Sequence, residues 1–158
     1  MKKNYMLLGG AIGLFISLSI NVKAQDNGNS NFSPRNYINA YVGLIEYNIN
    51  YERNIVQRSK SFSNVRLGFG HASLLIGGEG KYINAAFIHL IGKKNSHLET
   101  NLGVKYMVSN SISDPQFSET LIPDAFLGYR YEKPLEGLIF RIGLNYPTFI
   151  NLGTGYKF

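Results

Sequence analysis

Residues 150–158, at the end of the chain, read INLGTGYKF. Alternate side chains of a β-strand point to opposite faces of its sheet. Asparagine, glycine and lysine would lie on one face of this segment, and the other face would carry Ile150, Leu152, Thr154, Tyr156 and Phe158. A large apolar side chain gains little at a fraying chain end unless something buries it. The segment therefore predicts a strand with one apolar face. What covers that face has to be inferred from the rest of the sequence.

The same alternation recurs through most of the preceding sequence, in segments that begin near residues 37, 46, 65, 81, 98, 124 and 138. With the last segment, this pattern predicts eight strands, and no other part of the chain after the N-terminal region shows a helical period. The segment 81–91, KYINAAFIHLI, is apolar on both faces, so its facing stays open. Turn-rich or polar connections are expected at 54–64, 92–96, 109–120 and 132–137.

The N-terminal region is typical of an export signal. Two lysines precede the apolar run MLLGGAIGLFISLSI, and small residues follow at Val22 and Ala24. We predict a cleaved signal helix over 1–24, a flexible lead over 25–36 and a barrel over 37–158. A membrane-spanning helix would need roughly 20 predominantly apolar residues, more than this run offers. Removing Lys2, Lys3 and Lys23 lowers the formal charge from +6 to 6 − 3 = +3.

Composition excludes several classes of function. The chain has no cysteine, so neither disulfides nor a lipid-modified cysteine can anchor or stabilise it. The longest basic run after the signal is Lys93-Lys94, which gives no nucleic-acid footprint. The three histidines have no ligand-like spacing, so we expect no metal site and no cofactor. A small exported domain without disulfides must be stabilised in another way.

The two faces of the expected strands indicate how the domain could be stabilised without disulfides. A soluble barrel keeps apolar residues inside, yet here the polar face combines glycine with side chains of both charges. This suits an inverted barrel, in which apolar residues face lipid and paired charges fill a narrow lumen. A tilted strand needs about 9–11 residues to span a membrane, and segments 98–108 and 138–146 have this length. The expected lumen charge network comprises Glu52, Arg66, Glu99, Lys105, Asp124, Arg130 and Arg141.

Tyrosines near the strand ends extend this interpretation. Transmembrane barrels carry aromatic girdles where the wall meets the lipid headgroups. We expect Tyr51, Tyr106, Tyr131 and Tyr146 to form such girdles. The sequence therefore predicts an all-β fold: a closed antiparallel up-and-down transmembrane β-barrel of about eight strands.

The chain resembles the small eight-stranded outer-membrane β-barrel proteins of Gram-negative bacteria. The matching stretches are NYINAYVG at 36–43, IGKKNSHLE at 91–99 and FLGYRYEKPLEGLIFRIG at 126–143. The resemblance implies an outer-membrane location, contact with outer-membrane lipid and lipopolysaccharide, and a structural or interaction role without catalysis. It also implies that the barrel-assembly machinery reads a C-terminal signal, which here would be Leu152, Tyr156 and Phe158.

The resemblance implies a topology as well. Both chain ends would be periplasmic, together with the turns at 92–96 and 132–137. The connections at 45–46, 73–80, 109–120 and 147–149 would face outside.

Two alternatives remain open from the sequence. Outer-membrane lipid A deacylases use a His-x-Ser pair and a glutamate, and His71, Ser73 and Glu79 could form such a relay. The asparagine that follows the serine in that family is missing here, and the pair lies in the third expected strand rather than in the C-terminal strands. The other alternative is a soluble, lipocalin-like barrel, which would require apolar side chains around an internal ligand cavity.

Overall fold

The computed structural model describes residues 35–74, 78–110, 121–133 and 137–158. The expected signal helix over 1–24 and nearly all of the lead over 25–36 lie outside these ranges. Eight strands make up the described chain: β1 (Asn36–Gly43), β2 (Glu46–Gln57), β3 (Ser61–Leu74), β4 (Gly78–Lys93), β5 (Ser96–Asn110), β6 (Leu121–Glu132), β7 (Gly137–Tyr146) and β8 (Phe149–Lys157). Within these ranges, no helix is long and apolar enough to cross a membrane.

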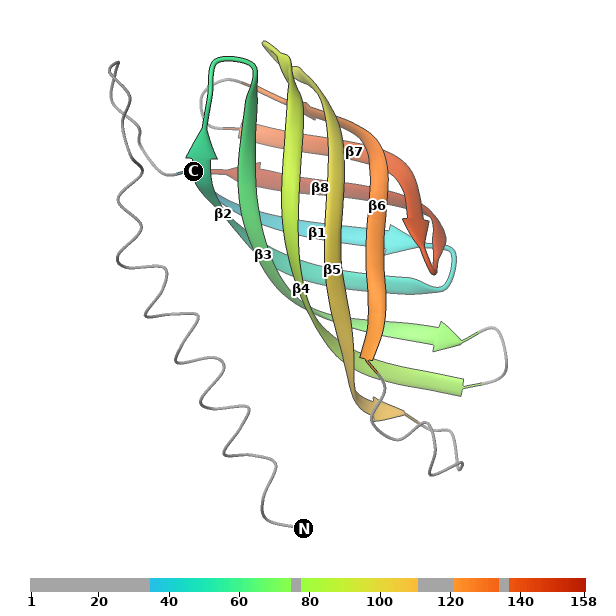
Figure 1. The fold of residues 1–158 in the computed structure, drawn as a ribbon. Coiled ribbons are helices and arrows are strands. Elements are labelled where there is room, and N and C mark those ends of the chain that lie inside the picture. The colour runs from blue at the N-terminus through green and yellow to red at the C-terminus, as the bar shows by residue number, and fades with distance from the viewer. Residues whose placement is uncertain (1–34, 75–77, 111–120, 134–136) are drawn as a thin grey trace. The chain divides into compact units, whose positions relative to one another are not determined.

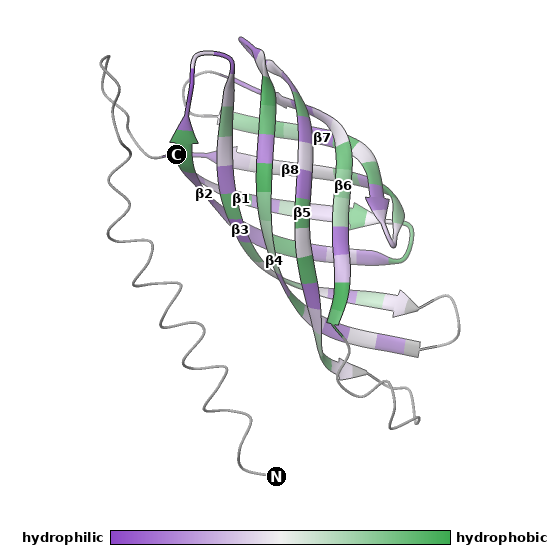
Figure 2. Ribbon diagram, viewed as in Figure 1, coloured by the Kyte–Doolittle hydropathy of each residue, from purple (hydrophilic) through white to green (hydrophobic). Residues whose placement is uncertain are grey.

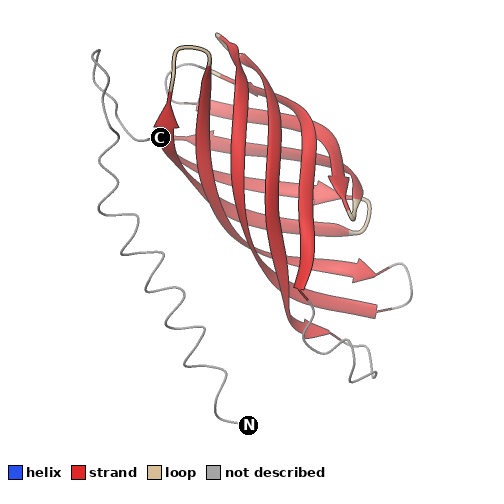
Figure 3. Ribbon diagram, in the orientation of Figure 1, coloured by secondary structure: helices blue, strands red, loops and turns tan. Residues whose placement is uncertain are grey.

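The strands form one closed antiparallel barrel in which each strand pairs with its neighbours in sequence, and β8 returns to β1 (Figures 1 and 3). The predicted eight-stranded up-and-down barrel is therefore confirmed. The last residue takes part in the closure, because Asn36 and Phe158 exchange two backbone N–H···O bonds of 3.0 Å. Closure leaves no unpaired strand edge along β1 and β8.

The barrel has two rims. The terminal rim holds Asn36, Phe158 and the ends of β2, β4 and β6. The distal rim holds the ends of β1, β3, β5 and β7. The distal connections expected over 73–80 and 109–120 are too long, because residues 73–74, 78–80 and 109–110 belong to strands. The remaining residues, 75–77 and 111–120, lie beyond the described ranges.

Side chains alternate across the wall as the sequence predicts, which Figure 2 shows as alternating hydropathy along the strands. On β2, for example, Glu46, Asn48, Asn50 and Glu52 are buried while the residues between them are exposed. The open facing of β4 is also settled. Tyr82, Asn84, Ala86, Ile88 and Leu90 point inward.

Two further boundary expectations are wrong. The basic segment 54–64 is mostly strand, and only residues 58–60 connect β2 to β3. The prediction failed because the polar side chains of Asn54 and Asn64 are buried inside the barrel and hydrogen-bonded to each other at 2.8 Å. The alternation starts a strand near Glu46, whereas the expected connection 45–46 includes it; the residue begins β2 and is buried in the lumen, so that connection is one residue too long.

Glycine allows close approach between β6 and β7. Gly128 and Gly143 face each other in the register, and a Cβ on Gly143 would lie 2.5 Å from the Gly128 Cα. The same Cβ would lie 2.6 Å from the ring of Phe126. The absence of side chains at these two glycines thus leaves space for the Phe126 ring against the inner wall. Such space matters because the interior of an eight-stranded barrel is only just wide enough for side chains.

Candidate functional site

The largest polar site is in the lumen, where a central cluster of charges joins five strands, β2, β3, β5, β6 and β7. Arg66 approaches Glu52 at 2.7 Å and Glu99 at 3.2 Å. Arg130 approaches Glu52 at 2.9 Å, and Arg141 approaches Glu99 at 3.1 Å. These five side chains are all buried, so each charge depends on its neighbours for compensation.

Aromatic rings line this central cluster. The guanidinium carbons of Arg66 and Arg141 lie 4.7 Å and 4.0 Å from the centre of the Tyr41 ring. Arg141 also lies 3.8 Å from the centre of the Phe126 ring. The Tyr41 hydroxyl donates to Glu52 at 2.8 Å. The rings therefore fill the space between the ion pairs and add cation–π attraction to them.

A distal cluster lies nearer the distal rim. Lys105 approaches Glu46 at 2.7 Å and Asp124 at 3.1 Å. Thr148 and Tyr82 donate to the same Glu46 carboxylate, each at 3.0 Å. The cluster thus ties β2 and β5 to β6 and to the connection before β8.

A terminal pair completes the lumen. Glu132 lies 3.3 Å from Lys157 and 2.9 Å from Arg130, which links the pair to the central cluster. Lys157 also donates to the backbone carbonyl of Lys133. Together the described lumen holds five carboxylates and five cations, namely Glu46, Glu52, Glu99, Asp124 and Glu132 with Arg66, Lys105, Arg130, Arg141 and Lys157.

The structure places all seven sequence-predicted charges in the lumen, five of them in the central cluster and two in the distal cluster. Sequence reasoning missed Glu46, Glu132 and Lys157 as members of the network. The alternation contained the signal, because each of the three lies on the polar side of its strand. All three stand at strand ends, and Glu46 and Glu132 also fall within the expected connections 45–46 and 132–137.

The outer wall has the opposite character. Leu102 on β5 is 73% exposed, and every strand exposes large apolar side chains in the same way. They include Ile38, Ile49, Leu67, Phe87, Leu98, Leu127, Ile142 and Leu152. A continuous apolar surface of this extent on a monomer marks contact with a membrane or a partner.

The predicted girdle tyrosines lie on this outer wall. Tyr51 and Tyr131 are near the terminal rim, where the Tyr51 hydroxyl donates to Asn36 at 2.7 Å and the Tyr131 hydroxyl accepts from Asn95 at 3.3 Å. Tyr106 and Tyr146 are near the distal ends of β5 and β7. The expected assembly residues Leu152, Tyr156 and Phe158 are all exposed on the same wall.

The candidate relay is only partly brought together. His71 Nε2 lies 3.7 Å from Glu79, and the His71 ring stacks on Tyr47 with centroids 5.4 Å apart. Ser73 is paired with Glu79 in the strand register, and its backbone N–H donates to Ile45. Within the described ranges, no hydrogen bond joins the Ser73 hydroxyl to His71, which an activated nucleophile requires. The relay stays a prediction.

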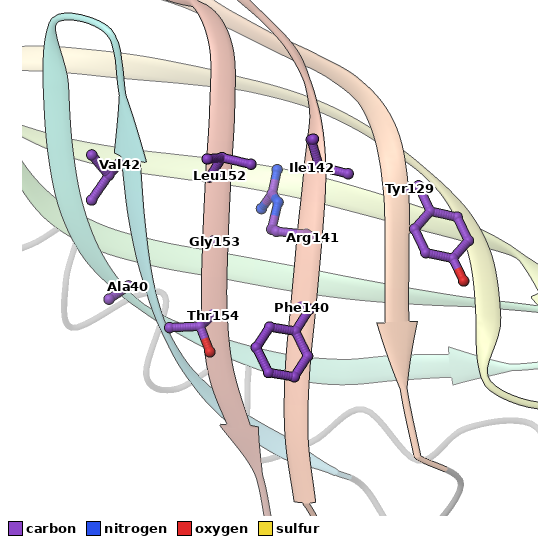
Figure 4. A pocket seen from close by; sticks show the side chains of 9 residues that line it. All are labelled: Ala40, Val42, Tyr129, Phe140, Arg141, Ile142, Leu152, Gly153 and Thr154. Carbon is purple, nitrogen blue, oxygen red and sulfur yellow. The ribbon is translucent and has the colours of Figure 1, made fainter.

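The described residues also show no metal site and an outer depression. Among the described residues, no group of three or more histidines or carboxylates could hold a metal ion. A shallow depression of about 530 Å³ lies on the outer wall across β1, β6, β7 and β8 (Figure 4). It is lined mainly by apolar side chains, among them Val42, Phe140, Ile142 and Leu152.

No known protein-family model matches this sequence, and neither does any curated protein sequence. Two solved structures are similar to the chain. One is a de novo designed transmembrane β-barrel, with a TM-score of 0.42 and 13% identity over 82% of this chain and 98% of that one. The other is the N-terminal β-barrel domain of Pseudomonas aeruginosa OprF, with a TM-score of 0.44 and 11% identity over 79% of this chain and 96% of that one.

Proposed function

We propose that this chain is an integral outer-membrane β-barrel protein of structural or interaction type, without catalysis. The observation that carries the proposal is the inversion of the wall: ten charged side chains are buried inside while large apolar side chains are exposed on every strand. In water this arrangement would be unfavourable on both faces, because charges would be buried inside and apolar side chains would be exposed to solvent. In a bilayer the exterior is in its preferred solvent, and the closed sheet satisfies its backbone groups internally.

The same proposal gives the barrel an orientation and surroundings. The terminal rim faces the periplasm and the distal rim faces outside, where lipopolysaccharide contacts the wall. The chain reaches the membrane through a cleaved signal over 1–24, and the barrel-assembly machinery inserts it by reading Leu152, Tyr156 and Phe158. A soluble ligand-carrying barrel is disfavoured, because its cavity would be apolar, whereas the described lumen is crowded with ion pairs.

Membrane fractionation with heat-modifiable gel mobility tests the proposal. We expect the native chain in the outer-membrane fraction, as a compact band that shifts on boiling because the closed barrel resists detergent until heated. Recovery of a soluble periplasmic protein whose mobility does not change on boiling would overturn the proposal.

A pair of charge substitutions tests the inversion directly. Leu102 lies near the middle of β5 and is 73% exposed, whereas Val108 lies near its distal end and is 52% exposed. On a soluble surface, Leu102→Arg and Val108→Arg would both be tolerated. In a bilayer, Leu102→Arg should cost about 2–4 kcal/mol of unfolding free energy and Val108→Arg about 0–1 kcal/mol, measured by denaturant titration in lipid vesicles.

A further inference from the structure

A small groove opens on the outer wall at the terminal rim, where β2 ends and β3 begins beside β4. Its volume is about 300 Å³. It lies outside the lumen network and away from the expected assembly residues. Its lining comprises Val56, Arg58, Ser61, Phe62, Ser63, Phe87 and His89.

A β-bulge shapes this groove. The register between β2 and β3 shifts between Asn54 and Val56. The Asn54 amide holds the bulge from inside, donating to the Ser63 carbonyl at 3.1 Å and to the Asn64 side chain at 2.8 Å. A bulge bends its strand and increases the local twist. The end of β2 is thus turned relative to β3, beside the groove that Val56 and Ser63 line.

A serine and a histidine form a fixed polar pair in the groove. Ser63 and His89 are opposite each other in the register, and Ser63 Oγ lies 2.9 Å from His89 Nδ1. The contact orients the imidazole ring and occupies one of its two nitrogens. Nε2 is thereby left for a second partner.

The surroundings of the groove are positively charged. Arg58 belongs to its lining, and Lys60, Lys93 and Lys94 are exposed on the two adjacent turns. The turns are held together by the Gly92 N–H, which donates to the Lys60 carbonyl at 3.0 Å. In the part of the terminal rim that the structure describes, no exposed side-chain carboxylate offsets these cations.

The groove also changes from charged to apolar between the terminal rim and the middle of the wall. Arg58 lies at the rim, the Ser63–His89 pair follows, and Phe87 stands two residues further along β4 toward the middle of the wall. A phospholipid presents its groups in the same order, with an anionic phosphate at the surface and acyl chains below it. Basic side chains next to a bilayer attract anionic headgroups.

We propose that this groove binds one glycerophospholipid of the leaflet at the terminal rim, an inference that rests on the membrane function proposed above. Arg58 and His89 Nε2 contact the phosphate, and Ser63 positions the imidazole. Val56 and Phe87 contact the upper part of an acyl chain. Lys60, Lys93 and Lys94 add long-range attraction for the negative headgroup.

Native mass spectrometry of the refolded full barrel tests this site, with phosphatidylglycerol added in detergent and retention of one lipid as the readout. Loss of one basic contact to an anionic headgroup corresponds to about a fivefold loss of binding. We expect this loss for Arg58→Gln and for His89→Phe, which keeps the ring but removes its nitrogens. Lys81→Gln, an exposed cation near the distal rim, is the matched control and should retain lipid as the native chain does.

Two further binding measurements test whether the groove recognises the phosphate as part of a lipid. Diacylglycerol, which lacks the phosphate, should bind at least about fivefold more weakly, and inorganic phosphate should not displace the lipid. Equal retention by all variants, equal retention of diacylglycerol, or displacement by inorganic phosphate would each overturn the assignment. Heat-modifiable mobility of the same samples reports whether the barrel folds, so failure of the groove is distinguished from failure of the membrane proposal.

Discussion

Glu52 on β2 accepts hydrogen bonds from side chains on three other strands. Tyr41 donates from β1 at 2.8 Å, Arg66 from β3 at 2.7 Å and Arg130 from β6 at 2.9 Å. Its carboxylate thus crosses the lumen and compensates two buried guanidinium groups at once. Removing one member of such a set leaves its partners charged and dehydrated, which costs far more than the pair itself contributes.

We therefore expect Glu52→Gln to lower the unfolding free energy by about 3–5 kcal/mol in lipid vesicles. The matched control is Glu79→Gln, whose side chain is 69% exposed beside His71 and which should cost less than about 1 kcal/mol. The double variant Glu52→Gln with Arg66→Gln should cost less than the sum of the two single changes, since it also removes an uncompensated cation. A loss for Glu52→Gln of less than about 1 kcal/mol would contradict this role of the central cluster.

Directly after β8, the backbone and the aromatic side chain of Phe158 have separable roles. Phe158 exchanges two backbone hydrogen bonds with Asn36 and exposes its ring on the outer wall. Deleting the residue removes both bonds and the ring, whereas Phe158→Ala removes only the ring. A comparison of the two changes separates closure of the barrel from recognition of the aromatic group.

We expect Phe158→Ala to reduce the amount of heat-modifiable protein in the outer membrane of cells while a refolded sample keeps the native denaturant midpoint within error. Deletion of Phe158 should reduce both, with a stability loss of about 1–3 kcal/mol for two backbone hydrogen bonds. If Phe158→Ala assembles in cells as well as the native chain does, the ring is not the assembly signal.

The strands show where sequence reasoning succeeds and where it stops. Alternation predicts the strand number and the facing wherever one face is polar, as on β2 and β8. It fails on β4, because Ile88 and Leu90 point into the lumen while Phe87 and Ile91 are exposed outside. Near the terminal rim the lumen is partly apolar, with Ile139 buried there as well. A period of two is visible only when the two environments differ in polarity.

The candidate site was predictable to a similar degree. Charges within strands were placed in the lumen by alternation, but their pairing was not, because which cation meets Glu99 depends on the stagger of strands across the barrel. Residues at strand ends were missed for a related reason. Polar residues such as Asn54 are common both in turns and in a polar lumen, so composition does not distinguish a turn from the end of a strand.

For the molecule as a whole, the lumen determines what can pass. The described interior holds equal numbers of buried carboxylates and cations. Barrels of eight strands have an interior just wide enough for side chains to fill. An ion entering this path would have to displace ion pairs that already compensate each other.

We accordingly expect the purified barrel to show no stepwise conductance in planar bilayers, at moderate or high salt, with a pore-forming barrel as the positive control. Insertion should be verified on the same membranes by protease protection of the wall. Discrete, reproducible current steps from a preparation that is fully heat-modifiable would contradict the filled lumen.

The pairing of β1 with β8 has a consequence for how the chain folds. Every other pairing in the wall joins neighbours in sequence, and only this one joins the two ends of the barrel. Hairpins close short loops at modest entropic cost, whereas the final pairing closes a ring that contains the whole barrel. We therefore expect the entropic cost of non-local contact to be concentrated in this pairing, which depends on the curvature and stagger of the other seven pairings. An open sheet would leave both of its edges unpaired, so the barrel is expected to form in an all-or-none manner.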